Sequence, residues 1–144
     1  MGEHMVFRPD IVVSGPDGVM LVVEVKASLP NLQHSEEQLK RYMIGMQCPT
    51  GVIVTPEHMW VYRDFYTARS PDSIQRIGEF DTKDLWRQPP PSEPMLFEAF
   101  VQQWLERLAQ QPTQDLPRNV RETLWEYIVP AVTSGDVRAT HPRN

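Results

Sequence analysis

The sequence predicts a mixed α/β (α+β) fold in which one mixed β-sheet is flanked by helices. Short segments rich in β-branched and aliphatic residues occur in the first half of the chain, and two long stretches of helical periodicity follow in the second half. Residues 19–27 are also almost continuously apolar. A strand of this kind is covered on both faces, so we expect it in the interior of the sheet.

The first half of the chain predicts a hairpin, a helix and further strands. Strands are expected over residues 6–13 and 19–27, because the segment Ser14-Gly15-Pro16-Asp17-Gly18 between them is a turn sequence. A helix is expected over residues 35–47, where apolar side chains recur at helical spacing. Further strands are expected over residues 51–55 and 59–62, with an edge strand at 74–80.

The composition changes at residues 88–92, Gln-Pro-Pro-Pro-Ser, which predict a stiff, extended connector. A strong apolar stripe over residues 95–108 then predicts an amphipathic helix. A second helix is expected from about Pro117 to Val129, where Pro130 disturbs it, and the polar segment after Ser134 is expected to fray. We therefore expect a core over residues 1–88, on which a connector and helices over residues 89–144 pack to form one globular domain.

Composition narrows the classes of function. A chain of 144 residues with 40% hydrophobic content suits a single core. The net charge of −5 argues against an extensive, non-specific DNA-binding surface. The longest apolar run, Val19 to Val23, is too short to cross a bilayer, so we expect no membrane partner. The single cysteine, Cys48, excludes an intramolecular disulfide and a cysteine zinc site, and is compatible with the cytoplasm.

Charged residues on the hairpin need an explanation, because burying an unpaired ion is costly. Glu24 and Lys26 are two residues apart and project from the same face of their strand. A three-residue Pro16-Asp17-Gly18 loop would set Gly15 opposite Val19 and Asp10 opposite Glu24. A two-residue turn would shift the register by one and move Asp10 to the other face. The glycine favours the register in which the two carboxylates meet.

Two carboxylates that face each other across a hairpin repel each other. A divalent cation relieves this repulsion, and hard oxygen ligands favour Mg²⁺, with Mn²⁺ as a substitute. The alternative is an ordinary salt bridge between Lys26 and one of the carboxylates. We favour the metal site, with Asp10 and Glu24 as ligands.

Pro9-Asp10, followed after a turn by Glu24-Val25-Lys26, resembles the signature of the PD-(D/E)xK nuclease superfamily. The segment from Gln38 to Tyr42 resembles the Gln-x-x-x-Tyr motif of the branch that includes the RecB nuclease domain and lambda exonuclease. The resemblance implies a restriction-endonuclease-like fold. Members usually begin with a helix, but only seven residues precede Arg8. We therefore expect a core that lacks most of this leading helix and carries a C-terminal helical extension.

The resemblance implies a Mg²⁺-dependent nuclease that hydrolyses phosphodiester bonds of DNA, an endonuclease rather than an exonuclease. Asp10, Glu24 and the backbone carbonyl of Val25 would hold the metal. Lys26 would orient the attacking water or stabilise the phosphate.

The helix after the hairpin would supply supporting groups. The resemblance implies that Gln38 and Tyr42 assist the lysine or the bound phosphate. Alternatively, Ser35 and Gln38 form a capping box and Tyr42 is an aromatic at the edge of the core. Lys40 and Arg41 would contact backbone phosphates or, alternatively, form only a solvated face.

A second hypothesis is a non-catalytic module, in which a nuclease-like fold serves in dimerisation or protein docking. It is supported by the acidic composition, the missing leading helix and the stripe from Leu96 to Leu108. A third is an unrelated α+β protein in which the charged cluster is coincidental. The sequence thus predicts DNA as the partner and leaves a homodimer open.

Overall fold

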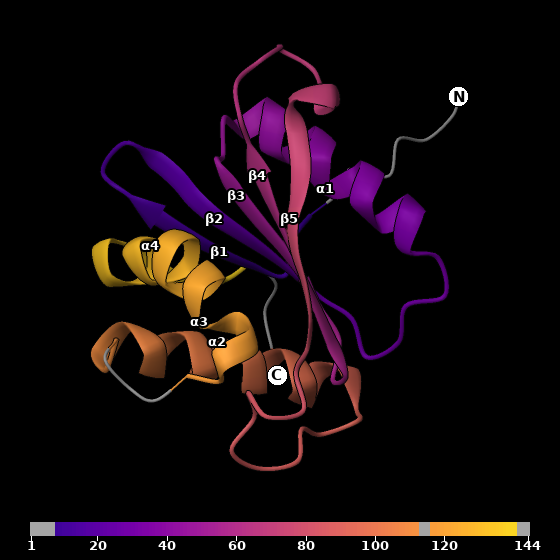
Figure 1. Cartoon of the computed structure of the whole chain (residues 1–144), viewed down its shortest axis with the longest axis vertical. Coiled ribbons are helices and arrows are strands. Elements are labelled where there is room, and N and C mark those ends of the chain that lie inside the picture. Colours follow the sequence, from indigo (N-terminus) through magenta and orange to yellow (C-terminus); the bar gives the residue numbers. More distant parts are fainter. Residues whose placement is uncertain (1–7, 113–115, 141–144) are drawn as a thin grey trace.

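The computed structural model describes residues 8–112 and 116–140. Its centre is a six-stranded sheet with the strand order β5-β4-β3-β2-β1-β6 (Figure 1). The strands are β1 (Ile11–Gly15), β2 (Gly18–Val25), β3 (Thr50–Val54), β4 (His58–Asp64), β5 (Ile74–Asp81) and β6 (Asp136–Ala139). Only β2 and β3 pair in parallel, and the other neighbouring pairs are antiparallel. The expected mixed sheet is confirmed; the first residues of the expected first strand, 6 and 7, lie outside the described residues.

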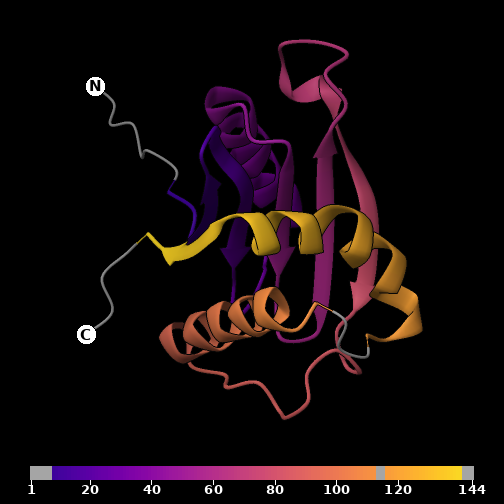
Figure 2. The ribbon, with the colours of Figure 1, turned by 90° about the vertical axis from the view of Figure 1, so that its left-hand side faces the viewer.

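Helices cover both faces of the sheet. The helix α1 (Leu32–Met46) packs on one face, and a short 3₁₀ helix, η1 (Pro71–Ser73), precedes β5. The other face is covered by α2 (Pro94–Gln110) and by a second helical segment formed by α3 (Arg118–Thr123), the π-turn η2 (Leu124–Ile128) and α4 (Val129–Ser134). Figure 2 shows these two helical segments side by side on that face. In the described part of the chain, no helix combines the length and apolar character needed to cross a membrane.

Side chains that alternate along β2 enter two different cores. Val22 packs with Leu39 and Met43 of α1, whereas Val23 packs with the apolar residues of α2. Both valines are at most 2% exposed. The prediction that this strand is covered on both faces is therefore confirmed, and the period-two geometry of a strand explains the division.

The β1–β2 turn differs from the expected one. Gly15 pairs with Gly18, so the connection is a two-residue Pro16-Asp17 turn, and the expected pairing of Gly15 with Val19 is wrong. Ser14 pairs with Val19 but Val13 pairs with Leu21, which leaves Met20 as one extra residue in β2. A bulge of this kind shifts the register by one residue. It therefore cancels the shift that the shorter turn introduces, and Ile11 pairs with Val23.

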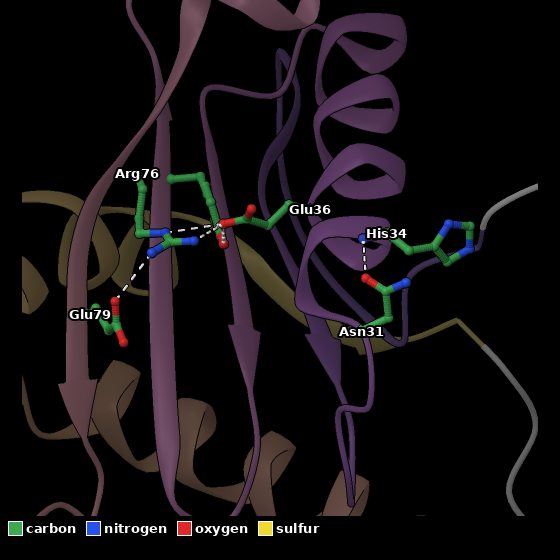
Figure 3. Close-up of polar contacts among 6 residues, drawn as sticks. Asn31, His34, Glu36, Arg76 and Glu79 are labelled. Carbon is green, nitrogen blue, oxygen red and sulfur yellow. Dashed lines mark hydrogen bonds and ion pairs between the residues drawn. The ribbon is translucent and has the colours of Figure 1, made fainter.

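The helix α1 begins one turn earlier than the sequence pattern predicts. Asn31 caps it, because the Asn31 side chain accepts a hydrogen bond of 3.1 Å from the backbone N–H of His34 (Figure 3). Ser35 lies inside the helix and is buried. The expected start at Ser35 is therefore wrong, and so is the capping box in which Gln38 would reach back to Ser35.

The C-terminal segment contains two departures from the sequence-based expectation. Pro130 does not end the helix: the Val129 N–H bonds to the Leu124 carbonyl in the preceding π-turn, and the helix continues to Ser134. Proline lacks a backbone N–H and crowds the carbonyl four residues earlier, and the wider π-turn accommodates it. The expectation that residues after Ser134 fray is wrong for residues 136–139, because β6 pairs with the outer edge of β1, and residues 141–144 lie outside the described residues.

Glu36 joins α1 to the strands beneath it. The buried Tyr62 hydroxyl of β4 donates a hydrogen bond to the Glu36 carboxylate. Arg76 of β5 donates to the same oxygen at 2.5 and 3.0 Å, and Arg76 also pairs with Glu79 at 3.2 Å (Figure 3). Burial and the neighbouring Glu36 carboxylate raise the pKa of Tyr62, so the phenol remains a donor.

We expect Glu36→Ala to lower the free energy of unfolding by about 2–3 kcal/mol, because it leaves the buried Tyr62 hydroxyl without its acceptor and Arg76 without its main partner. Urea denaturation followed by circular dichroism measures this loss. Glu37→Ala is the matched control, since Glu37 is the next residue of α1 and is exposed. Equal unfolding midpoints for the two variants would contradict a stabilising role of this network.

Candidate functional site

The predicted acid–lysine cluster, Asp10, Glu24 and Lys26, lies at the end of the sheet where β1 begins and β2 ends. Ile11 pairs with Val23, and the same register extended by one residue sets Asp10 opposite Glu24. Lys26 follows β2 directly, and its backbone N–H donates to the Val54 carbonyl of β3 at 2.9 Å. The structure therefore brings these three residues together, with the bulge at Met20 rather than a three-residue loop setting the register.

Hydrogen bonds to two neighbouring strands hold Asp10 in place. The Asp10 carboxylate accepts a hydrogen bond of 2.8 Å from the Val25 backbone N–H and so completes the β1–β2 ladder at its end. The Thr140 N–H, just after β6, donates to the Asp10 carbonyl at 3.0 Å. The Thr140 hydroxyl donates to the Pro9 carbonyl. Asp10 is therefore fixed from both sides.

Glu24 is only 5% exposed, and its two carboxylate oxygens have different surroundings. Oε2 lies 3.1 Å from the Lys26 ammonium, whose side chain is 38% exposed. Oε1 is buried and accepts no hydrogen bond within the described part of the chain. The salt bridge that was the alternative to a metal site exists, but it satisfies only one of the two oxygens. A buried polar atom of this kind needs an explanation, such as a bound ion.

The pKa of Asp10 is raised in this site. Burial, followed by the negative charge of Glu24 and a hydrogen bond to Glu24, raises the pKa of Asp10 to about 6. The Val25 N–H opposes this rise. A proton on Asp10 relieves the repulsion below about pH 6, and above this pH a cation between the two carboxylates would relieve it.

Glu98, on α2, is the residue that sequence reasoning missed. Its side chain interacts with Asp10 and lowers the Asp10 pKa. In the sequence, Glu98 is one carboxylate among the apolar residues of the α2 stripe, and only the packing of α2 under this end of the sheet relates it to Asp10. Even so, within residues 8–112 and 116–140 no three His, Cys, Asp or Glu side chains are arranged to hold a metal. A cation here would need carbonyl, water or substrate oxygens as well.

The four supporting residues on α1 divide between different sides of the helix. Lys40 lies 6.0 Å above the Tyr62 ring, two strands away from Glu24. At about 100° per residue, Gln38 and Tyr42 lie on the opposite flank. Tyr42 packs at the edge of the core beneath α1, and Arg41 is exposed. The structure therefore does not bring Lys40 to the acid–lysine cluster.

No protein-family model, no curated protein and no solved structure matches this chain. A function is therefore inferred from the site itself. Its chemistry is that of two adjacent, buried carboxylates, an ammonium group on one of them, and one carboxylate oxygen that lacks a hydrogen bond.

We expect Asp10→Asn to stabilise the metal-free protein at neutral pH. A raised folded-state pKa means that the unfolded chain releases its Asp10 proton from about pH 4, whereas the folded protein retains it to about pH 6. The free energy of unfolding therefore falls as the pH rises through this window. Asparagine avoids this loss and still accepts from the Val25 N–H. The expected gain above pH 7 is at most about 2 kcal/mol, because Asp10 is partly solvated.

Urea denaturation in EDTA between pH 4 and pH 8 measures this difference. Asp17→Asn is the control, because it removes an exposed carboxylate from the turn at the other end of the hairpin. A stability difference between Asp10→Asn and the parent that stays constant across this pH range would contradict the raised pKa.

Proposed function

We propose that this protein is a Mg²⁺-dependent nuclease that hydrolyses phosphodiester bonds of DNA at the acid–lysine cluster. The observation that carries the proposal is the Glu24 Oε1 atom, which is buried, lacks a hydrogen bond and lies in a carboxylate that neighbours Asp10. Such an arrangement is costly unless a proton or a cation lies between the carboxylates, and Lys26 contacts only the other Glu24 oxygen, Oε2.

Asp10, Glu24 and the Val25 carbonyl are the proposed metal ligands. The Val25 N–H points toward Asp10, and in a regular strand the carbonyl of a residue points to the same side as its N–H. This supports the Val25 carbonyl as a third oxygen. Mg²⁺ in phosphate-processing sites often uses only one or two carboxylates and completes its shell with waters and substrate oxygens. The chemistry of these donors therefore fits Mg²⁺, with Mn²⁺ as a substitute.

The metal, when bound, would lower the pKa of a coordinated water and offset negative charge on the phosphate. Lys26 supplies the positive charge of the chain itself. Its ammonium is held by Glu24 and remains partly open to solvent, so it can orient the attacking water or stabilise the phosphate. Glu98 is a proposed positioning residue, because it interacts with Asp10 from α2.

We further propose that the chain is a reduced member of the PD-(D/E)xK superfamily with a restriction-endonuclease-like core. The order of β1, β2, α1 and β3, with Asp10 and Lys26 on the hairpin, supports this assignment. Gln38 and Tyr42 retain their proposed supporting role, on the flank of α1 opposite Lys40. Endonucleolytic cleavage is the proposed mode.

The alternative of a non-catalytic docking module loses one of its supporting observations. The apolar stripe of α2 packs within its own chain, where Phe97, Trp104 and Leu108 are at most 6% exposed. Among the stripe residues named for docking, Leu96 is 59% exposed. Met95 beside it is 48% exposed, and two exposed apolar side chains at the start of a helix are normal on a surface, so we retain catalysis as the better-supported function.

We expect the protein to cleave DNA, offered both as supercoiled plasmid and as circular single strands, in Mg²⁺ or Mn²⁺ and to be inactive in EDTA. Asp10→Asn and Lys26→Ala should each slow cleavage on the order of 100-fold or more, because each removes a group that stabilises charge at the phosphate. Asp17→Asn is the control for a lost carboxylate. Absence of cleavage by the parent in both metals, or unchanged rates in the two site variants, would contradict the proposal.

Calorimetric titration with Mn²⁺ tests the metal site without catalysis. Glu24→Gln and Asp10→Asn should weaken Mn²⁺ binding, since each replaces a charged ligand by a neutral amide. If both variants bind Mn²⁺ like the parent, these carboxylates are not the metal ligands.

A further inference from the structure

A cleft of about 850 Å³ lies at the same end of the sheet as the acid–lysine cluster. Its lining includes Ala27, the residue directly after Lys26, and the turn between β3 and β4. Its other side is formed by the end of β5 and the proline-rich connector to α2, which loops below the sheet in Figure 1. The cleft therefore reaches the residue that follows Lys26 in the chain.

The walls of this cleft are fixed by hydrogen bonds. The Pro56 carbonyl, in the β3–β4 turn, accepts hydrogen bonds from the Thr82 hydroxyl at 2.7 Å and from the Trp86 indole N–H at 2.9 Å. Trp86 also packs edge-on against Phe100 and Trp104 of α2, with ring centroids 5.2 and 5.6 Å away. The connector is thus tied both to the β3–β4 turn and to α2, and the cleft is preformed.

The lining combines flat apolar groups with a balanced set of charges. The rings of Pro56, Pro89 and the exposed His58 offer surfaces against which a base can pack, with one face of the His58 ring already stacked on Trp60 at a centroid distance of 5.7 Å. The lining includes two cations, Lys83 and Arg87, and two carboxylates, Glu57 and Asp81. The Asp81 carboxylate already accepts the Lys83 backbone N–H at 2.8 Å.

Charge and size indicate what the cleft can hold. Duplex DNA is bound mainly through many phosphate contacts to a strongly basic surface, which neither this cleft nor the chain's net charge of −5 provides. Unpaired nucleotides need only ring surfaces and one or two phosphate contacts. A volume of about 850 Å³ falls in the range of sites for ligands of this size.

We propose that this cleft binds one or two unpaired nucleotides of a DNA strand next to the phosphate at the acid–lysine cluster, so that the substrate is single-stranded DNA. The inference rests on the proposed nuclease function. Lys83 and Arg87 contact the backbone phosphates, and His58 provides a ring for stacking. The DNA strand would then run from the acid–lysine cluster past Ala27 into the cleft.

Fluorescence anisotropy with a labelled 12-nucleotide single strand and its duplex tests this inference, in Ca²⁺ to hold the substrate without relying on cleavage. The parent should bind the single strand more tightly than the duplex. Lys83→Glu and Arg87→Glu should each weaken single-strand binding about tenfold at low salt. His58→Ala should weaken it at least about fivefold, the effect expected for loss of one stacked base. Arg69→Ala is the control, because Arg69 is an exposed cation in the loop at the other end of β4.

The outcomes separate this inference from the proposed function. Plasmid nicking that depends on Asp10, together with cleft variants that bind the single strand like the parent, would overturn the cleft while leaving the nuclease. The assignment of the cleft would also be overturned if the parent bound the duplex more tightly than the single strand. It would be overturned too if Arg69→Ala lost as much single-strand affinity as the cleft variants. A parent that cleaves no DNA in either metal would contradict the nuclease function itself, and with it the assignment of the cleft.

Discussion

The placement of two carboxylates at one end of the β1–β2 ladder is the constraint around which this structure is organised. Asp10 closes the ladder through the Val25 N–H, so it cannot turn away without losing a backbone hydrogen bond. Glu24 sits on a strand covered on both faces, so it cannot reach solvent. The electrostatic cost of this pair is relieved only by a proton, by Lys26 or by a cation. The hydrogen bonds from Thr140 and the contact with Glu98 show that distant parts of the chain hold this end of the sheet in place.

The two ends and two faces of the sheet serve different purposes. The end that holds the acid–lysine cluster also receives the beginnings of α1 and α2, the β3–β4 turn and the connector, and it has the cleft beside it. By contrast, the side of α1 above β4 and β5 is occupied by the network of Glu36, Tyr62 and Arg76. Lys40 lies over Tyr62 within this region. A cation that looked suited to phosphate binding is therefore placed among structural contacts.

The hairpin illustrates how a correct placement can follow from an incorrect local structure. The glycine after Pro16-Asp17 predicted a three-residue loop, whereas the chain forms a two-residue turn and a bulge at Met20. Both arrangements bring Asp10 beside Glu24, because only a register that keeps the apolar residues of β1 and β2 facing their cores satisfies burial. The hydrophobic pattern thus constrained the register more strongly than the turn did. Capping of α1 was less constrained, since Asn and Ser are both residue types that cap helices, and in the structure the Asn31 side chain makes the capping hydrogen bond.

Periodicity along the chain was sufficient to predict the β1–β2 hairpin, the double coverage of β2, the order of the main elements and the shared face of Glu24 and Lys26. Each of these features follows from which residues of one short segment are apolar and become buried, so it can be predicted from that segment alone. The strand β6, the contact between Glu98 and Asp10 and the cleft depended on tertiary packing. Residues 136–139 carry too little apolar pattern to indicate a strand, and they become one because the edge of β1 offers unpaired backbone groups. Glu98 reaches Asp10 only because the apolar face of α2 packs under the sheet, an interaction between segments far apart in the sequence.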